Sequence, residues 1–223
     1  MMNLARLLGL RRSPTPFEER DVVLIIADIG GYTEFMLSTQ TSLLHGQMII
    51  NELIQAIIDQ VQIPLKVAKL EGDAVFLYAI KDGSDANWQH IRRQISEKLL
   101  VFFDVFSDKL KQLGKSTHCT CDACANIGGL RLKIIVHTGT AAFYKIGDFT
   151  ELSGVDVIIV HRLLKNSVNL QEYILMTEAA FSDVPILSEV EAQQHEETYP
   201  AIGTLRTRLY PLRYYHSHAE HHR

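Results

Sequence analysis

The stretch that most strongly decides the fold is VVLIIADIGGYT, which runs from Val22 to Thr33. Its first six residues are all apolar, and an unbroken apolar run of this length predicts a strand that is buried on both faces. The run ends at Asp28, which is followed by Gly30 and Gly31. Glycine lets a phosphate-bearing ligand approach the backbone closely, and a carboxylate can bind a hard cation. We therefore expect a ligand-binding edge directly after this strand.

A second aspartate lies in a matched context. Asp73 ends the motif KLEGD, residues 69–73, and precedes an apolar run that begins at Ala74. The Gly-Asp pair predicts the tip of a β-hairpin. Two carboxylates at strand edges can hold two divalent ions over one triphosphate, as metal-assisted phosphoryl or nucleotidyl transfer requires. Each aspartate alone also has an ordinary explanation, because Asp28 is suited to cap a helix and Asp73 to serve a turn.

The rest of the chain alternates helical and extended patterns. Helices are expected at 33–60, with a break near Gly46, at 88–113 and at 155–165. Strands are expected at 22–27, 65–70, 74–80, 130–137, 141–146, 173–177 and 205–212, with a turn at Thr138-Gly139. This order predicts an α+β sandwich on a ferredoxin-like core, in which helices cover one face of a mixed or antiparallel sheet.

Composition sets the broad class. The chain has 223 residues, 47% of them hydrophobic, and a formal net charge of -4. This length suits one globular domain, and the acidic balance argues against a nucleic-acid-binding protein. No apolar stretch is long enough to span a bilayer, and the N-terminal arginines are not arranged as in a secretory signal. We therefore expect a cytoplasmic protein with an N-terminal arm at 1–20, a domain at 21–212 and a disordered histidine-rich tail at 213–223.

The three cysteines fall within one heptapeptide, inside a loop expected at 115–129. His118, Cys119, Cys121 and Cys124 offer four ligands of the kind that zinc binds in closed tetrahedral sites. However, Cys119 and Cys121 are separated by one residue instead of the usual two, and no second cysteine pair follows. A zinc site, reduced thiols packed in a loop, and a redox role therefore all stay open.

The chain resembles the class III nucleotidyl cyclases, which are the catalytic domains of adenylate and guanylate cyclases. The motifs that carry the resemblance are ADIGGYT at 27–33, KLEGD at 69–73 and the segment from Gly154 to Leu163 with Arg162. In element order it covers roughly residues 20–212. The Cys-x-Cys-x-x-Cys loop and HRLLKN at 161–166 look like a bacterial branch of that superfamily known mainly as a domain of unknown function.

The resemblance implies a two-metal reaction at a homodimer interface. Mg²⁺ or Mn²⁺ ions hold the triphosphate of ATP or GTP, and the ribose 3′-hydroxyl attacks the α-phosphate and expels pyrophosphate. Asp28 and Asp73 match the metal ligands of the family, and the backbone carbonyl of Ile29 matches a third ligand. Arg162 matches the arginine that stabilises charge in the transition state. The family takes its metal ligands from one subunit and this arginine from the other.

The resemblance also assigns residues to the nucleotide. Lys69 matches the lysine that recognises the base, and Glu151 lies near the position of its acidic partner. Two departures weaken the match. Ile158 stands where the family has an asparagine that orients the ribose, and its side chain has no hydrogen-bonding atom. The region that carries a triphosphate-binding lysine in the family has none here, and Arg206 or Arg208 is the candidate replacement.

Several alternatives therefore stay open. The chain is either a cyclase that forms a 3′,5′-cyclic nucleotide and pyrophosphate, a catalytically silent nucleotide-binding or scaffold module, or a sensor governed by its cysteine loop. Lys69 and Glu151 are also compatible with an ordinary surface pair, and Arg162 with a solvent-facing residue. Base preference is left open, because a Lys-Glu pair is not the usual Lys-Asp pair. We expect His137 and His161 to be packed or hydrogen-bonded residues, not ligands.

Overall fold

The apolar run at 22–27 forms the middle of the central strand, β1 (Glu18–Gly30), and its six side chains are fully buried. β1 pairs antiparallel with β3 (Ala74–Ile80) on one side and with β4 (Arg131–Ile146) on the other. Alternate residues of the run join two different hydrophobic cores, because successive side chains of a strand point to opposite faces of the sheet. The predicted doubly buried strand is confirmed.

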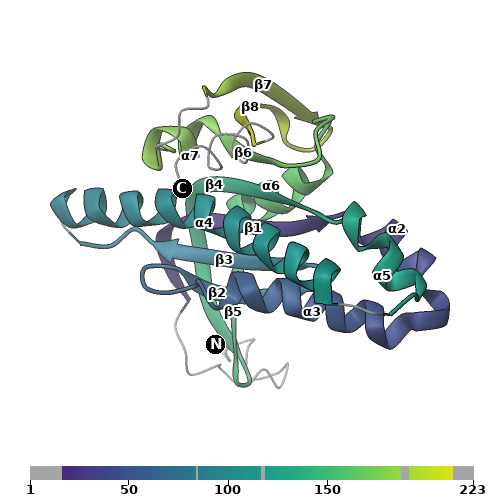
Figure 1. The fold of residues 1–223 in the computed structure, drawn as a ribbon. Helices are drawn as coiled ribbons and strands as arrows, with labels where there is room; N and C mark the ends of the chain where they lie inside the picture. Colours follow the sequence, from purple (N-terminus) through teal and green to yellow (C-terminus); the bar gives the residue numbers. More distant parts are fainter. Residues whose placement is uncertain (1–16, 84, 117–118, 187–190, 213–223) are drawn as a thin grey trace.

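The computed structural model describes residues 17–83, 85–116, 119–186 and 191–212 (Figure 1). Its sheet has eight strands in the order β2-β3-β1-β4-β6-β8-β7, and β5 pairs with β4 outside this path. The remaining strands are β2 (Lys66–Glu71), β5 (Phe149–Ser153), β6 (Tyr173–Thr177), β7 (Gln193–Tyr199) and β8 (Gly203–Pro211). Among the described strands, only β4 and β6 pair in parallel. The predicted α+β fold with a mixed sheet is confirmed.

The helices cover both faces of the sheet, unevenly. One face carries α3 (Leu43–Ile58) and α4 (Asp85–Ser116), which lie side by side in Figure 1, together with α2 (Tyr32–Ser38), α5 (Asp122–Asn126) and α7 (Glu178–Asp183). The opposite face carries α6 (Val155–Arg162) and the 3-10 turn η3 (Leu163–Lys165), which bury Ile159, Val160 and Leu163. The expectation that helices cover one face was therefore wrong for α6.

Two glycines that predicted breaks serve close packing instead. The helical pattern at 33–60 is interrupted at η1 (Gln40–Ser42), before Gly46, which lies inside α3. A Cβ at Gly46 would lie 2.9 Å from the Oγ1 of the buried Thr39. The turn predicted at Thr138-Gly139 is also wrong, because β4 runs straight through it. Gly139 has no side chain there because a Cβ would collide with the Asp156 carboxylate.

The sequence pattern does not predict β5, β7 or α7, which are short and carry many polar residues. The loop at 115–129 contains the end of α4, the helix α5 and the 3-10 turn η2 (Ile127–Gly129). β1 begins at Glu18, so the sheet starts within the segment expected to be an N-terminal arm; residues 1–16 and the tail at 213–223 lie outside the described residues. In the described part of the chain, no helix has both the length and the apolar character needed to cross a membrane.

Candidate functional site

The structure brings Asp28 and Asp73 together where β1 ends and the β2–β3 hairpin turns. These two residues and the backbone around them are called the carboxylate edge below. Asp28 lies near the end of β1, opposite Ala74, which is the residue after Asp73. The backbone N–H of Ile29 donates to the carbonyl of Asp73, with an N···O distance of 3.2 Å. This bond ties the tip of the β2–β3 hairpin to the end of β1. Two carboxylates and nearby backbone carbonyls form a donor set that fits a hard divalent cation.

A lysine that the sequence reasoning missed is paired with this edge. Lys133 lies opposite Asp28 in the β1–β4 register, and its Nζ is 2.9 Å from Asp28 Oδ2. Burial acts to lower the pKa of Lys133, but the charge and hydrogen bond of Asp28 outweigh burial and raise it. The pKa of Asp73 is raised to about 6, first by burial and then by the charge of Asp28. Charge repulsion between the two carboxylates is therefore only partly offset by Lys133.

Asp73→Asn is expected to stabilise the metal-free protein at about pH 8. Because the folded-state pKa of Asp73 is raised to about 6, ionisation removes stability as the pH rises through that value. The gain is about 1–2 kcal/mol, after a discount for solvent screening of a half-buried group, or about 2–8 °C in Tm. Thermal unfolding in a chelator checks this. At about pH 4, where Asp73 is mostly protonated, the gain should vanish, and the exposed Asp82→Asn should show no gain at either pH. An equal gain at both values would contradict the assignment.

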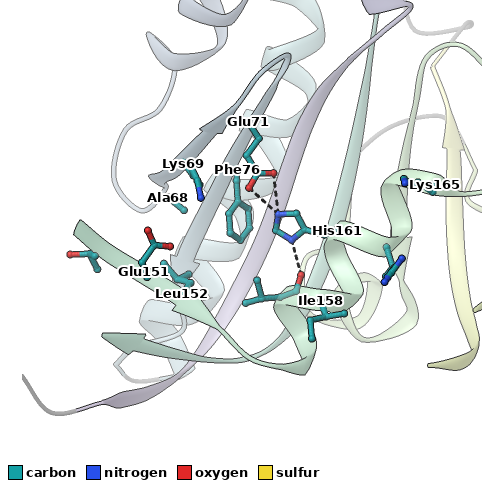
Figure 2. A pocket seen from close by; sticks show the side chains of 12 residues that line it. Ala68, Lys69, Glu71, Phe76, Glu151, Leu152, Ile158, His161 and Lys165 are labelled. Carbon is teal, nitrogen blue, oxygen red and sulfur yellow. Dashed lines mark hydrogen bonds and ion pairs between the residues drawn. The ribbon is translucent and has the colours of Figure 1, made fainter. Parts of the chain in front are cut away.

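A pocket of about 450 Å³ lies on the α6 face of the sheet, between β2, β3, β5 and α6 (Figure 2). Lys69 of β2 and Glu151 of β5 lie at one end of it, and Lys165 lies toward the other end. Arg162 and Ile158 line it from α6, and 54% of the Ile158 surface is exposed. Among the described residues no ion pair joins Lys69 to Glu151, so both groups face the pocket without neutralising each other.

The pocket and the carboxylate edge share one face of the sheet but are separate. Leu24 and Ile26 of β1 pack into the core under α6, and Asp28 continues this alternation. Lys133 Nζ lies 3.5 Å from the carbonyl of Leu164 in η3, which places it on the same face. Neither Asp28 nor Asp73 lines the pocket. The structure therefore sorts the predicted site residues into a carboxylate group and a pocket group.

His161 and Glu71 line the pocket and were not predicted as site residues. His161 Nδ1 lies 2.7 Å from the carbonyl of Val157, so its N–H donates a hydrogen bond to that oxygen. Nε2 lies 3.1 Å from Glu71 Oε2, and the ring packs edge-on against Phe76 with centroids 4.9 Å apart. These contacts, drawn in Figure 2, hold the imidazole across the pocket wall. The expectation that His161 is a hydrogen-bonded residue is confirmed.

A chain of side-chain hydrogen bonds attaches α6 to the sheet. His137 Nε2 lies 2.9 Å from Asp156 Oδ1 of α6, and His137 Nδ1 lies 2.8 Å from Thr177 Oγ1. Thr177 is the N-cap of α7, and its side chain also accepts the backbone N–H of Ala180. The other Asp156 oxygen accepts the backbone N–H of Thr140 at 2.7 Å. Burial acts to raise the pKa of Asp156, but the bonds from His137 and Thr140 lower it. Asp156 is thus engaged away from the pocket and does not replace the missing asparagine.

Arg206 is not brought to this pocket. Leu205 and Leu209 of β8 pack under the α6 face, so Arg206 points to the opposite face because side chains alternate along a strand. There it lines a different pocket with Glu178 and Arg208, and Arg208 donates two hydrogen bonds of 2.9 Å to Glu178. In the α6 pocket the additional cation is Lys165, which the sequence reasoning missed.

The cysteine loop lies apart from the pocket. Cys119, Cys121 and Cys124 gather around His45, while His118 lies outside the described residues. The pKa of Cys121 is lowered to about 6, mainly by the backbone N–H of Cys124 and further by hydrogen bonds with the neighbouring thiols and His45. Spacing could not point to His45, because it is separated from Cys121 by 76 residues and meets it only in the fold.

The family model of DUF2652, described as a protein of unknown function, matches residues 50–173, which is more than half of the chain. An uncharacterised protein of Mycobacterium tuberculosis, Rv2561/Rv2562, is 35% identical over 127 residues, which cover 57% of this chain and 56% of that protein. The chain thus spans about half the length of the curated relative it matches.

Solved structures with a similar fold are cyclase domains. The guanylyl cyclase Cya2 matches with a TM-score of 0.68 at 12% identity, over 88% of this chain and 94% of that one. The adenylyl cyclase CyaB from P. aeruginosa matches with a TM-score of 0.62 at 12% identity, over 87% and 96%. The catalytic core of a rhodopsin-guanylyl cyclase, solved in complex with ATPalphaS, matches with a TM-score of 0.58 at 15% identity, over 87% and 98%. At these identities the likeness establishes the fold of a nucleotidyl cyclase domain.

Proposed function

The chain belongs to DUF2652, a family of proteins of unknown function, and we propose that it is a cyclase-like protein that binds a metal–purine nucleoside triphosphate between two copies of itself. One copy supplies Asp28, Asp73 and the backbone carbonyl of Ile29 to hold Mg²⁺ or Mn²⁺. The other copy supplies its pocket. The reaction that this arrangement supports is closure of the nucleotide to a 3′,5′-cyclic product.

One observation carries the proposal: the two groups of predicted residues share a face of the sheet but do not share a cavity. The carboxylate edge provides negative charge for cations, and the pocket provides Lys69, Arg162 and Lys165 for a base and phosphates. A site that needs both groups is completed when the pocket of one copy meets the carboxylate edge of another. Two-fold symmetry then makes two such sites in one dimer.

The pocket residues have distinct roles in this proposal. Lys69 and Glu151, at one end, hydrogen-bond to the edge of the purine. Arg162 and Lys165 stabilise negative charge on the phosphates as the ribose 3′-oxygen bonds to the α-phosphorus and pyrophosphate leaves. When bound, the metal ions neutralise the triphosphate and favour loss of the 3′-hydroxyl proton. Glu71 and His161 brace each other across the wall and keep the pocket open.

Ile158 favours a second candidate function. Its exposed apolar side chain stands in the pocket where the cyclase pattern has a hydrogen-bonding residue, and Asp156 does not substitute for it. Loss of one preorganised transition-state group costs on the order of a hundredfold or more in rate. The second candidate is therefore a module that binds the metal–nucleotide without turning it over.

The test is to incubate the full chain with Mn²⁺ and each of the four ribonucleoside triphosphates, then measure cyclic nucleotide and pyrophosphate by mass spectrometry. Product that disappears in Asp73→Ala supports the cyclase, and equal product from this variant contradicts it. If no product forms, a nucleotide-dependent rise in Tm of roughly 5–10 °C at saturation, lost in Asp73→Ala, supports the binding module. Neither product nor stabilisation would overturn both functions.

A further inference from the structure

Four soft or borderline donors converge at the N-terminal end of α3, away from the α6 pocket. One ligand atom from each of His45, Cys119, Cys121 and Cys124 can be chosen so that all four lie within 4.8 Å of one another. His45 comes from the first turn of α3, and Cys119 and Cys121 precede α5. Cys124 lies inside α5. Three thiols and one imidazole form the donor set of closed zinc sites.

The distances among His45, Cys121 and Cys124 match the edges of a zinc tetrahedron. With zinc–sulfur and zinc–nitrogen bonds of about 2.3 and 2.05 Å, a tetrahedral site has sulfur–sulfur edges of about 3.8 Å and sulfur–nitrogen edges of about 3.6 Å. Here the sulfurs of Cys121 and Cys124 are 3.7 Å apart. His45 Nδ1 lies 3.3 Å from the sulfur of Cys121 and 3.8 Å from that of Cys124.

Backbone and side-chain hydrogen bonds help to place these ligands. Cys121 is the residue before α5, and its carbonyl accepts the backbone N–H of Ala125 at 3.1 Å. This bond starts the helix and sets Cys124 one turn further on the same side. A second hydrogen bond joins the start of α3 to the start of α5: Thr41 Oγ1, just before α3, donates to Asp122 Oδ2 at 2.8 Å.

The alternatives to a metal fit these observations less well. The contact of 3.7 Å between Cys121 and Cys124 sulfurs is a van der Waals distance, far beyond a disulfide bond of about 2.05 Å. Thiols that merely pack as small apolar groups are typically buried, whereas Cys119 is exposed and the other three members are partly exposed. The set contains no carboxylate, so it does not suit Mg²⁺ or Ca²⁺.

We propose that His45, Cys119, Cys121 and Cys124 bind one Zn²⁺ ion per chain in a closed, structural site that ties α3 to α5. All four positions are taken by protein ligands, so the site has no open position for a substrate. This ligand set replaces the one expected from spacing, with His45 in place of His118.

The proposed zinc site also supports the turn beside the carboxylate edge. α5 continues directly into η2, and the carbonyl of Gly129 lies under Gly31, where a Cβ would approach it to 2.8 Å. Gly31 has a φ of 81°, a conformation that glycine adopts without strain, and it lies three residues after Asp28. Zinc bound at α5 therefore positions the backbone against which this turn packs, and acts on the turn by position only.

Zinc content is the first measurement. Because the tail contains four histidines, the full chain is prepared with His216, His218, His221 and His222 replaced by Gln, then dialysed against a weak chelator. Elemental analysis is expected to find one zinc per chain. Cobalt substitution is expected to give the visible absorption of a tetrahedral thiolate site. Zinc well below one per chain, with no rise in Tm when Zn²⁺ is added to reduced protein, would overturn the proposal.

Matched variants then identify the ligands. His45→Gln is expected to weaken zinc binding in a chelator competition by at least about 100-fold. Loss of a group that only orients a zinc ligand costs up to about 100-fold in affinity, and loss of a ligand itself should cost no less. His118→Gln is the control and should keep the wild-type affinity. His45→Cys should restore tight binding, so a defect of His45→Gln cannot be ascribed to misfolding. Wild-type affinity in His45→Gln, or a loss only in His118→Gln, would overturn the assignment. No nucleotide is present, so the result is independent of the proposed function.

Discussion

A 1:1 mixture of Asp73→Ala and Arg162→Ala chains is expected to form cyclic product at about a quarter of the wild-type rate, although each variant alone forms almost none. Asp73 lies at the carboxylate edge and Arg162 lines the separate pocket, so each substitution damages a different half of the proposed site. Removing either the metal ligand or the charge-stabilising arginine costs on the order of a hundredfold or more.

The factor of a quarter follows from symmetry. Random pairing makes about half of the dimers mixed, and each mixed dimer has one site with both halves intact and one site with neither. The rate is measured after the chains have exchanged partners, with light scattering to establish that dimers form. Arg93→Ala, at an exposed arginine on α4, is the matched control. Alone it should keep the wild-type rate, and mixed 1:1 with Asp73→Ala it should give about half of that rate, which is the value expected from dilution alone.

Failure of the mixture is equally informative. If dimers exchange but the mixture of Asp73→Ala and Arg162→Ala stays inactive, both groups act within one chain, and the composite site is wrong. If Arg162→Ala alone keeps the wild-type rate, then Arg162 is a solvent-facing residue, which is the ordinary alternative for an exposed arginine on a helix.

Ile158→Asn is expected to raise the rate of product formation by about 100-fold. Ile158 lines the pocket from α6, and its side chain is largely exposed, so a polar residue there loses little packing. Asparagine adds a donor and an acceptor where the nucleotide ribose is proposed to lie. A hydrogen bond that orients the reacting 3′-hydroxyl recovers the transition-state stabilisation whose absence we infer from the apolar side chain.

Two variants control for this change. Val155→Asn places the same amide on the same helix at an exposed position outside the pocket and should leave the rate unchanged. Ile158→Leu keeps the apolar character and should also leave it unchanged. The measurement is initial rate at saturating Mn²⁺–nucleotide. A rate that falls in Ile158→Asn would mean that the pocket uses its apolar wall for another ligand group.

Much of the fold could be predicted because burial and turn chemistry are local signals. The six apolar residues before Asp28 predicted the doubly buried centre of the sheet, and Gly72-Asp73 predicted the hairpin tip. The glycines at 46 and 139 were misread, because a glycine that admits a neighbouring side chain looks the same in sequence as one that ends an element. The polar segments that form β5 and β7 carry no clear alternation to reveal them.

The candidate site was predictable only in part for a related reason. The resemblance placed Lys69, Glu151 and Arg162, and the fold brings these three to one pocket. Arg206 was assigned by loop position, whereas the alternation of β8 sends it to the other face. His45 and Lys133 were missed because each acquires its partner only when strands or helices distant in sequence pack together.

The ion pair between Lys133 and Asp28 has a consequence for ion selectivity. A lysine tethered 2.9 Å from a carboxylate is an internal competitor, present at a constant and high local concentration. At the proposed metal site an incoming cation competes with this ammonium group for Asp28 Oδ2, and a singly charged ion gains no more from the carboxylates than the ammonium group does. A divalent ion, which carries twice the charge, gains more from Asp28 and Asp73 together. We therefore expect Lys133 to discriminate against monovalent ions at the proposed metal site. Substitutions of Lys133 should change the cation affinity of this site while the carboxylates stay the same.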